Sequence, residues 1–118
     1  MAYRGDVIEL VEAHVGAFNA GEVGRVLAGL ATDVVWQTGS DEFVGLDDVE
    51  RLLRGAAGLF PALEIKRVLV DGQRAAVEMI ERYLHEGQAR EVAIAVFFSF
   101  EGGLISRVKV FREGSADP

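Results

Sequence analysis

Three side chains in the sequence are suited to acid–base chemistry and lie within apolar patterns: His14, Glu81 and Tyr83. His14 lies on a helical apolar stripe between Val11 and Phe18. Glu81 and Tyr83 occupy alternate positions of a strand pattern, on the face expected to point inward. A carboxylate on such a face loses hydration, which favours its protonated form and suits it to proton transfer. We predict all three as catalytic residues, with Glu81 as acid or base, His14 as its partner and Tyr83 as a hydroxyl donor.

Each of these residues also has a purely structural interpretation. Glu81 could pair with Arg112 or with His14, and a buried pair of this kind needs no catalysis. His14 could be a satisfied core histidine, and Tyr83 could simply pack its ring. His85, beside a turn, is expected in solvent. Around the three candidates we expect a ligand-binding wall formed by Trp36, Thr38, Phe43, Met79, Val96, Phe98 and Arg112.

The sequence offers no pattern for metal, thiol or phosphate chemistry. It has no cysteine, and its two histidines are far apart, so no metal-ligand spacing emerges. The stretch Gly21–Gly24 lacks the preceding strand that a phosphate-binding loop requires. There is no Gly-x-Ser-x-Gly elbow for a hydrolytic triad. We therefore expect neither a metal nor any other cofactor.

Composition indicates one globular domain. The chain has 118 residues, half of them hydrophobic, and can bury a core without disulfides. Its formal net charge of −7 argues against a nucleic-acid partner, because phosphate binding needs clustered Lys and Arg. No apolar run approaches the length of a membrane span, and no secretory signal is visible at residues 1–6. We expect a cytoplasmic protein that does not bind membranes.

Apolar residues spaced three and four apart predict helices in the first half of the chain. The first is expected at Tyr3–Asn19. The second places Val23 and Leu30 inward and is expected to end at Thr32 and Asp33, since both residue types prefer caps and turns.

A third helix is predicted to start at Asp47, with Glu50 completing a capping box. Its apolar residues Leu52, Leu53 and Ala56 share one face with Val49. Gly58 and Pro61 are expected to stop this helix.

Alternating apolar residues and turn glycines predict strands elsewhere. Asp71-Gly72 is a strong hairpin signal. The expected strands are Val34–Thr38, Glu42–Val44, Leu63–Val70, Arg74–His85, Arg90–Phe100 and Leu104–Arg112. Helices first and hairpin-linked strands last indicate an α+β fold with an antiparallel sheet. Long strands must twist and bend, which leaves space for a ligand, here a small hydrophobic molecule, between sheet and helices.

The strand expected at Arg90–Phe100 is apolar on both faces, so it needs a covering layer on each side. Helices can cover only one face. We expect a second copy of the chain to cover the other, as a homodimer. The outer patch would comprise Ile80, Leu84, Ala95, Phe97 and Phe111.

Several local segments resemble the ketosteroid-isomerase-like and SnoaL-like polyketide-cyclase-like domains of the nuclear-transport-factor-2-like superfamily. They are His14–Glu22, Ala31–Trp36, Phe43–Val49 and Val108–Glu113. The resemblance covers roughly residues 4 to 113. It implies three N-terminal helices packed on a strongly curved, cone-shaped antiparallel sheet around a central apolar pocket. It also implies a single domain at residues 1–113 followed by a polar tail at 114–118.

Function does not transfer with this fold, because the superfamily includes isomerases, cyclases, hydrolases and non-catalytic binding modules. The isomerases' oxyanion-binding tyrosine would fall on His14, their aspartate base on Thr38 and their protonated aspartic acid on Val96. Threonine is no base near neutral pH and valine donates no hydrogen bond, which argues against ketosteroid isomerase chemistry. The Asp-Arg-Asp arrangement of the limonene-epoxide-hydrolase branch is not recognisable. A cofactor-free isomerase, cyclase or hydrolase and a non-catalytic ligand-binding or dimerisation module both stay open.

Overall fold

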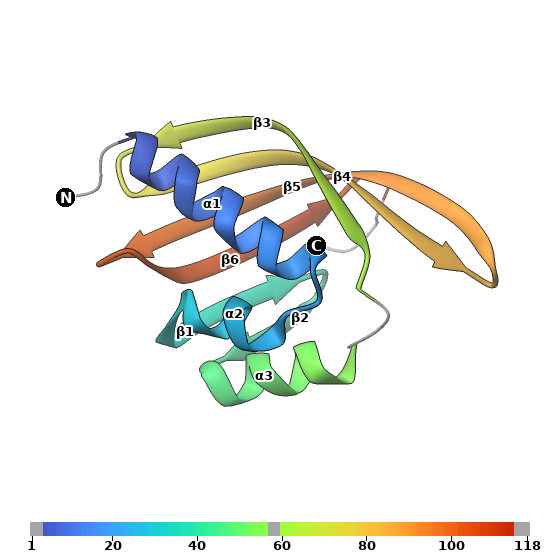
Figure 1. The fold of residues 1–118 in the computed structure, drawn as a ribbon, viewed down its shortest axis with the longest axis horizontal. Coiled ribbons are helices and arrows are strands. Elements are labelled where there is room, and N and C mark those ends of the chain that lie inside the picture. The colour runs from blue at the N-terminus through green and yellow to red at the C-terminus, as the bar shows by residue number, and fades with distance from the viewer. Residues whose placement is uncertain (1–3, 57–59, 115–118) are drawn as a thin grey trace.

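In its described residues, the protein forms a six-stranded sheet with three helices packed against it (Figure 1). The computed structural model describes residues 4–56 and 60–114. Along the chain its elements are α1 (Arg4–Asn19), α2 (Val23–Ala28), β1 (Leu30–Thr38), β2 (Asp41–Val44), α3 (Leu46–Gly55), β3 (Ala62–Asp71), β4 (Arg74–His85), β5 (Gln88–Glu101) and β6 (Leu104–Arg112). The expected α+β class is confirmed. No helix in the described ranges has both the length and the apolar character needed to cross a membrane.

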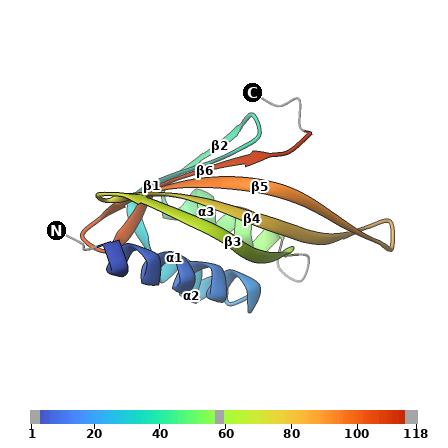
Figure 2. The ribbon, with the colours of Figure 1, turned by 90° about the horizontal axis from the view of Figure 1, so that it is seen from above.

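The sheet order is β2-β1-β6-β5-β4-β3. Neighbours from β3 to β6 pair antiparallel, as do β1 and β2. β1 and β6 pair in parallel, so the sheet expected to be antiparallel is mixed at this one junction. Figure 2 shows α1 and α2 on one side of the sheet, and residues of α1 and α3 line the same space on that side. The other face of the sheet is uncovered in the described part of the chain.

The start of β1 differs from the sequence prediction. α2 ends at Ala28, and Thr32 and Asp33, which were expected to end it, lie within β1. Gly29 closes the helix through its backbone, and its carbonyl oxygen accepts a hydrogen bond from the Ile105 N–H at 2.9 Å. That bond starts the pairing with β6. Thr32 and Asp33 then lie in a stretch where the register shifts, which suits turn-preferring residues.

The capping box predicted for the third helix is wrong. Gly45 takes the N-cap position with a φ of 86°, and it makes no side-chain cap. Asp48, rather than Asp47 or Glu50, satisfies a nearby donor: its Oδ2 accepts a hydrogen bond from the Val44 N–H at 3.2 Å. A glycine in the left-handed region lets the chain turn sharply from β2 into α3.

Parts of some predictions lie outside the described residues. These are Tyr3 as the start of the first helix, Gly58 as a stop signal for the third, and residues 115–118 of the polar tail.

The core lies between the helices and the facing side of β4 and β5. Buried apolar side chains come from α1, from α3 and from alternate positions of these strands, as their period predicts. They include Val7, Val11, Val15, Val49, Leu53, Val77, Met79, Val96 and Phe98. The end of α1 is held to β3 by one side chain. Asn19 donates from Nδ2 to the Leu63 carbonyl and accepts from the Leu63 N–H, both at 2.8 Å.

Candidate functional site

A cavity of about 190 Å³ lies between the sheet and the helices. Its wall is mostly apolar, with a few polar groups converging on it, which is the usual composition of a small-molecule site. Of the residues predicted for the site, those that line it are His14, Trp36, Thr38, Met79, Glu81, Val96, Phe98 and Arg112. Strands β1, β4, β5 and β6 and helix α1 therefore all contribute to one space.

Two predicted site residues lie elsewhere. Tyr83 does not line the cavity, and it is 39% exposed. It lies on β4, close to the hairpin that joins this strand to β5, and the hairpin extends beyond the helices (Figures 1 and 2). Phe43 lies on the edge strand β2, opposite Trp36, and packs on the core outside the cavity wall.

The sequence missed much of the wall on the helical side. Leu52, Leu53 and Ala56 line the cavity from the region of α3, and Phe18 and Phe60 stack at 4.6 Å between ring centroids beside them. The apolar stripe in the sequence identifies the residues of α3 as inward-facing. It does not distinguish residues that fill the core from residues that border an open space, since both are apolar.

Glu81 is a buried carboxylate whose charge is matched by Arg112. Arg112 donates from Nε to Oε1 at 3.1 Å and from Nη2 to Oε2 at 3.3 Å, so the pair is bidentate. The Glu81 side chain is 9% exposed and that of Arg112 is 39% exposed. Arg112 also donates from Nη1 to Thr38 Oγ1 at 2.7 Å. Of its two possible partners, Arg112 and His14, Glu81 therefore pairs with Arg112.

His14 is buried among aromatic rings. Its ring centroid lies 5.9 Å from that of Trp36 and 5.4 Å from that of Phe98. Burial lowers the pKa of His14 from 6.5 to about 4, because the charged imidazolium would lose its hydration. The imidazole is therefore neutral at pH 7. Its Nδ1 atom is buried and has no hydrogen-bond partner, and no hydrogen bond joins His14 to Glu81 within residues 4–56 and 60–114.

The site offers three kinds of polar contact to a ligand: a neutral imidazole, a carboxylate already held by a guanidinium, and the Thr38 hydroxyl. The described residues contain no cluster of three or more His, Asp or Glu that could hold a metal ion.

Comparison with known proteins identifies the family. The SnoaL-like domain model matches residues 11–108. The chain belongs to the SnoaL-like domain family. No curated protein sequence matches this SnoaL-like domain.

Solved structures share the fold at low identity. An NTF2-like protein of unknown function from Burkholderia pseudomallei has a TM-score of 0.85 and 20% identity, with 96% of this chain and 92% of that one covered. An LEH-like epoxide hydrolase from M. tuberculosis has a TM-score of 0.84 and 22% identity, with coverage of 92% and 84%. A protein from Catenulispora acidiphila with a ketosteroid isomerase-like fold, in complex with trimethylamine, has a TM-score of 0.81 and 14% identity, with coverage of 92% and 88%. These likenesses show the fold.

In this SnoaL-like domain, the two positions that the isomerase resemblance assigns to carboxylates, Thr38 and Val96, carry other side chains with other contacts. Thr38 accepts a hydrogen bond from Arg112, and Val96 contributes an apolar surface to the cavity. The buried carboxylate is instead on β4, at Glu81.

Proposed function

We propose that this SnoaL-like domain binds a small hydrophobic molecule in the cavity between its sheet and helices. The observation that carries the proposal is a cavity of about 190 Å³ with a mostly apolar wall, which His14, Glu81 and Thr38 also line. An apolar space on which a few polar groups converge is the usual composition of a small-molecule site.

Filling part of the cavity should weaken binding. Trp36 is the only tryptophan of the chain and lines the cavity, so its fluorescence reports on ligand entry. Benzene and cyclohexanone are expected to give saturable changes in emission. Val110→Phe places a ring in the cavity wall and should weaken binding by roughly tenfold or more, equivalent to about 1.4 kcal/mol.

The matched control is Val44→Phe, because Val44 is 54% exposed on β2 and does not line the cavity. This variant should bind both compounds as the unmodified chain does. Equal binding by both variants, with both folded by circular dichroism, would contradict the proposal.

Acid–base catalysis without a cofactor is the second candidate function. It is favoured by one observation: a carboxylate and an imidazole, Glu81 and His14, line the same cavity. An isomerase, cyclase or hydrolase of this kind would use Glu81 to move a proton. The bidentate pair with Arg112 fits a structural role for Glu81 equally well, so binding is the leading proposal. Tyr83 has no part in it, because it lies outside the cavity.

Exchange of the α-hydrogens of cyclohexanone in deuterated water, followed by NMR, tests for this chemistry. If Glu81 transfers the proton, Glu81→Gln should slow exchange by roughly a hundredfold or more, the usual contribution of a general base. Glu78→Gln is the matched control, because Glu78 is on the same strand but exposed on its opposite face. Exchange no faster than in buffer alone would leave the chain as a binding module.

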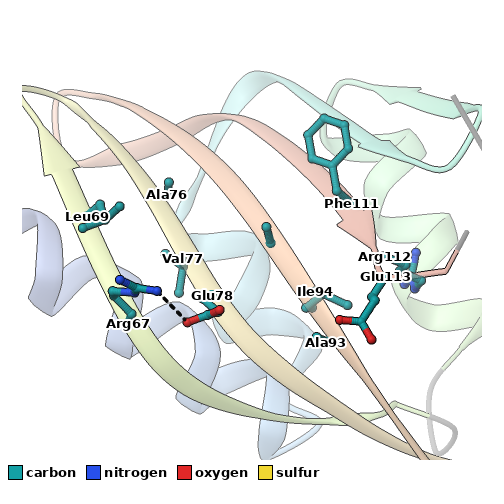
Figure 3. A pocket seen from close by; sticks show the side chains of 11 residues that line it. Arg67, Leu69, Ala76, Val77, Glu78, Ala93, Ile94, Phe111, Arg112 and Glu113 are labelled. Carbon is teal, nitrogen blue, oxygen red and sulfur yellow. Dashed lines mark ion pairs between the residues drawn. The ribbon is translucent and has the colours of Figure 1, made fainter.

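We also propose that the protein is a homodimer joined through the uncovered face of its sheet. Leu69, Phe97 and Phe111 are exposed there by 58%, 50% and 47%. Phe97 and Phe111 lie edge to face at 5.7 Å between ring centroids, and Ala95 lies directly opposite Phe111. Figure 3 shows part of this face, with Leu69 and Phe111 on either side of a groove. Apolar surface of this kind is typical of an interface between subunits.

The mass of the protein in solution tests the dimer. Phe97→Glu should raise the dissociation constant by roughly thirtyfold or more, because it replaces a central aromatic group with a charge. Sedimentation equilibrium should then find the monomer. Leu104→Glu is the matched control, because Leu104 is 39% exposed and lies at the opposite end of β6 from Phe111. This variant should leave the dimer intact. An unmodified chain that sediments as a monomer at all concentrations would refute the proposal.

A further inference from the structure

The unpartnered nitrogen of His14 constrains which atoms the cavity presents to a ligand. A neutral imidazole has one N–H donor and one bare acceptor nitrogen. Among the described residues, the Nδ1 atom of His14 is the buried side-chain nitrogen that has no hydrogen-bond partner. The Nε2 atom is not among these buried, unpartnered atoms, and His14 lines the cavity. Nε2 is therefore the ring nitrogen that can contact a ligand.

The tautomer follows from the cost of burying each form. A buried N–H group without an acceptor is rarer in proteins than an under-satisfied acceptor. The rings of Trp36 and Phe98 lie beside the imidazole and offer Nδ1 no strong acceptor. The favoured tautomer therefore leaves Nδ1 bare and carries its proton on Nε2. That places an N–H donor at the cavity wall, where it suits a ligand with an acceptor atom.

The charges of the site favour an uncharged ligand. Burial lowers the pKa of His14 to about 4, so at neutral pH the ring carries no charge to offset an anion. The one cation among the described wall residues, Arg112, is already paired in a bidentate manner with Glu81. A bound anion would be repelled by Glu81, and a bound cation would lose hydration against an apolar wall.

The size of the cavity limits the ligand further. A cavity of about 150 Å³ in another protein holds benzene, whereas drug-sized ligands occupy about 300–1,000 Å³. At about 190 Å³ the cavity here fits one six-membered ring with a small substituent. A polycyclic molecule would extend beyond this volume.

We propose that the cavity selects an uncharged molecule of about one six-membered ring that bears a hydrogen-bond-accepting oxygen, held by the Nε2–H group of His14. Carbonyl compounds, cyclic ethers and epoxides of this size share the required chemistry. This inference rests on the proposed function, because it specifies the ligand of the same cavity.

Three probes with a six-membered ring separate the requirements: cyclohexanone and methylenecyclohexane, which have nearly the same shape, and cyclohexanecarboxylate, which adds a charged group. Binding is measured through Trp36 fluorescence. Cyclohexanone should bind roughly threefold to tenfold more tightly than methylenecyclohexane, the contribution of one neutral hydrogen bond. Cyclohexanecarboxylate should bind more weakly than either. In His14→Leu, which keeps the volume of the side chain, the ketone and the hydrocarbon should bind equally.

A second measurement does not depend on any variant folding. Two-bond ¹H–¹⁵N correlation spectra of the ligand-free chain distinguish the two tautomers of His14 directly. The proton is expected on Nε2, and cyclohexanone should shift the Nε2 resonance more than that of His85. A proton on Nδ1, equal binding of ketone and hydrocarbon, or tighter binding of the carboxylate would overturn this inference while leaving ligand binding intact. Failure of all three probes to bind would instead refute the proposed function.

Discussion

Acidification from pH 7 to pH 4 is expected to lower the free energy of unfolding by about 3 kcal/mol through His14 alone. The folded-state pKa of His14 is about 4, below the value of 6.5 for the exposed group. Between these values the unfolded chain binds the proton and the folded chain does not. Stability from this residue is therefore complete above pH 6.5 and is lost as the pH falls toward 4. Urea denaturation at a series of pH values measures the slope.

The contribution of His14 is isolated by difference, since carboxylates also titrate in this range. His14→Leu should remove the part of the pH dependence between pH 4 and 6.5 that comes from His14, so that the variant loses less stability on acidification than the unmodified chain. His85→Leu is the matched control, because the His85 side chain is 59% exposed and should leave the slope unchanged. Parallel stability curves for the unmodified chain and His14→Leu would show that His14 is not buried neutral.

Removal of Arg112 is expected to cost about 3 kcal/mol, because it leaves the Glu81 carboxylate buried without its partner. We expect Arg112→Met to show this loss in chemical denaturation at pH 7. Arg107→Met is the matched control on the same strand. Arg107 is exposed and donates one hydrogen bond to Gln37 at 3.2 Å, so its removal should cost less than about 1 kcal/mol.

A double-mutant cycle separates the pair from the general effect of losing an arginine. Glu81→Gln removes the charge that Arg112 compensates, so the double variant should recover most of the stability lost in Arg112→Met. A coupling of about 2 kcal/mol is expected for groups in direct contact. Strict additivity of the two substitutions would mean that the bidentate contact contributes nothing to the fold.

The strands with strong local signals were predicted from sequence at the bounds that the structure has. Arg74–His85 and Leu104–Arg112 combine alternating apolar residues with glycine at the turns that bound them, and both signals are local. The start of β1 was missed because Gly29 pairs with Ile105, a contact between residues far apart in the chain. The N-cap of α3 was missed because Gly45 starts the helix through its backbone conformation, whereas the sequence predicted a side-chain cap from Asp47.

The candidate site was predictable in its parts but not in its assembly. Periodicity identified His14 and Glu81 as inward-facing, and both line the cavity. Periodicity fixes the face of a residue but not how far the covering helices extend, so Tyr83 was expected in a cavity that ends before it. The sequence left Arg112 and His14 as alternative partners of Glu81. Strand register decides between them, because Arg112 lies opposite Ile94, which in turn lies opposite Met79 on β4.

The contact between Asn19 and Leu63 bears on how the sheet avoids self-association. β3 is a terminal strand of the sheet, and the unpaired peptide groups of such a strand can recruit another chain. The side-chain amide of Asn19 occupies both peptide groups of Leu63, much as a neighbouring strand would. A single asparagine thus covers the sheet edge at Leu63, the residue of β3 that lies opposite Glu81. A strand of another chain cannot pair with β3 at this position, so the edge cannot start fibril growth there.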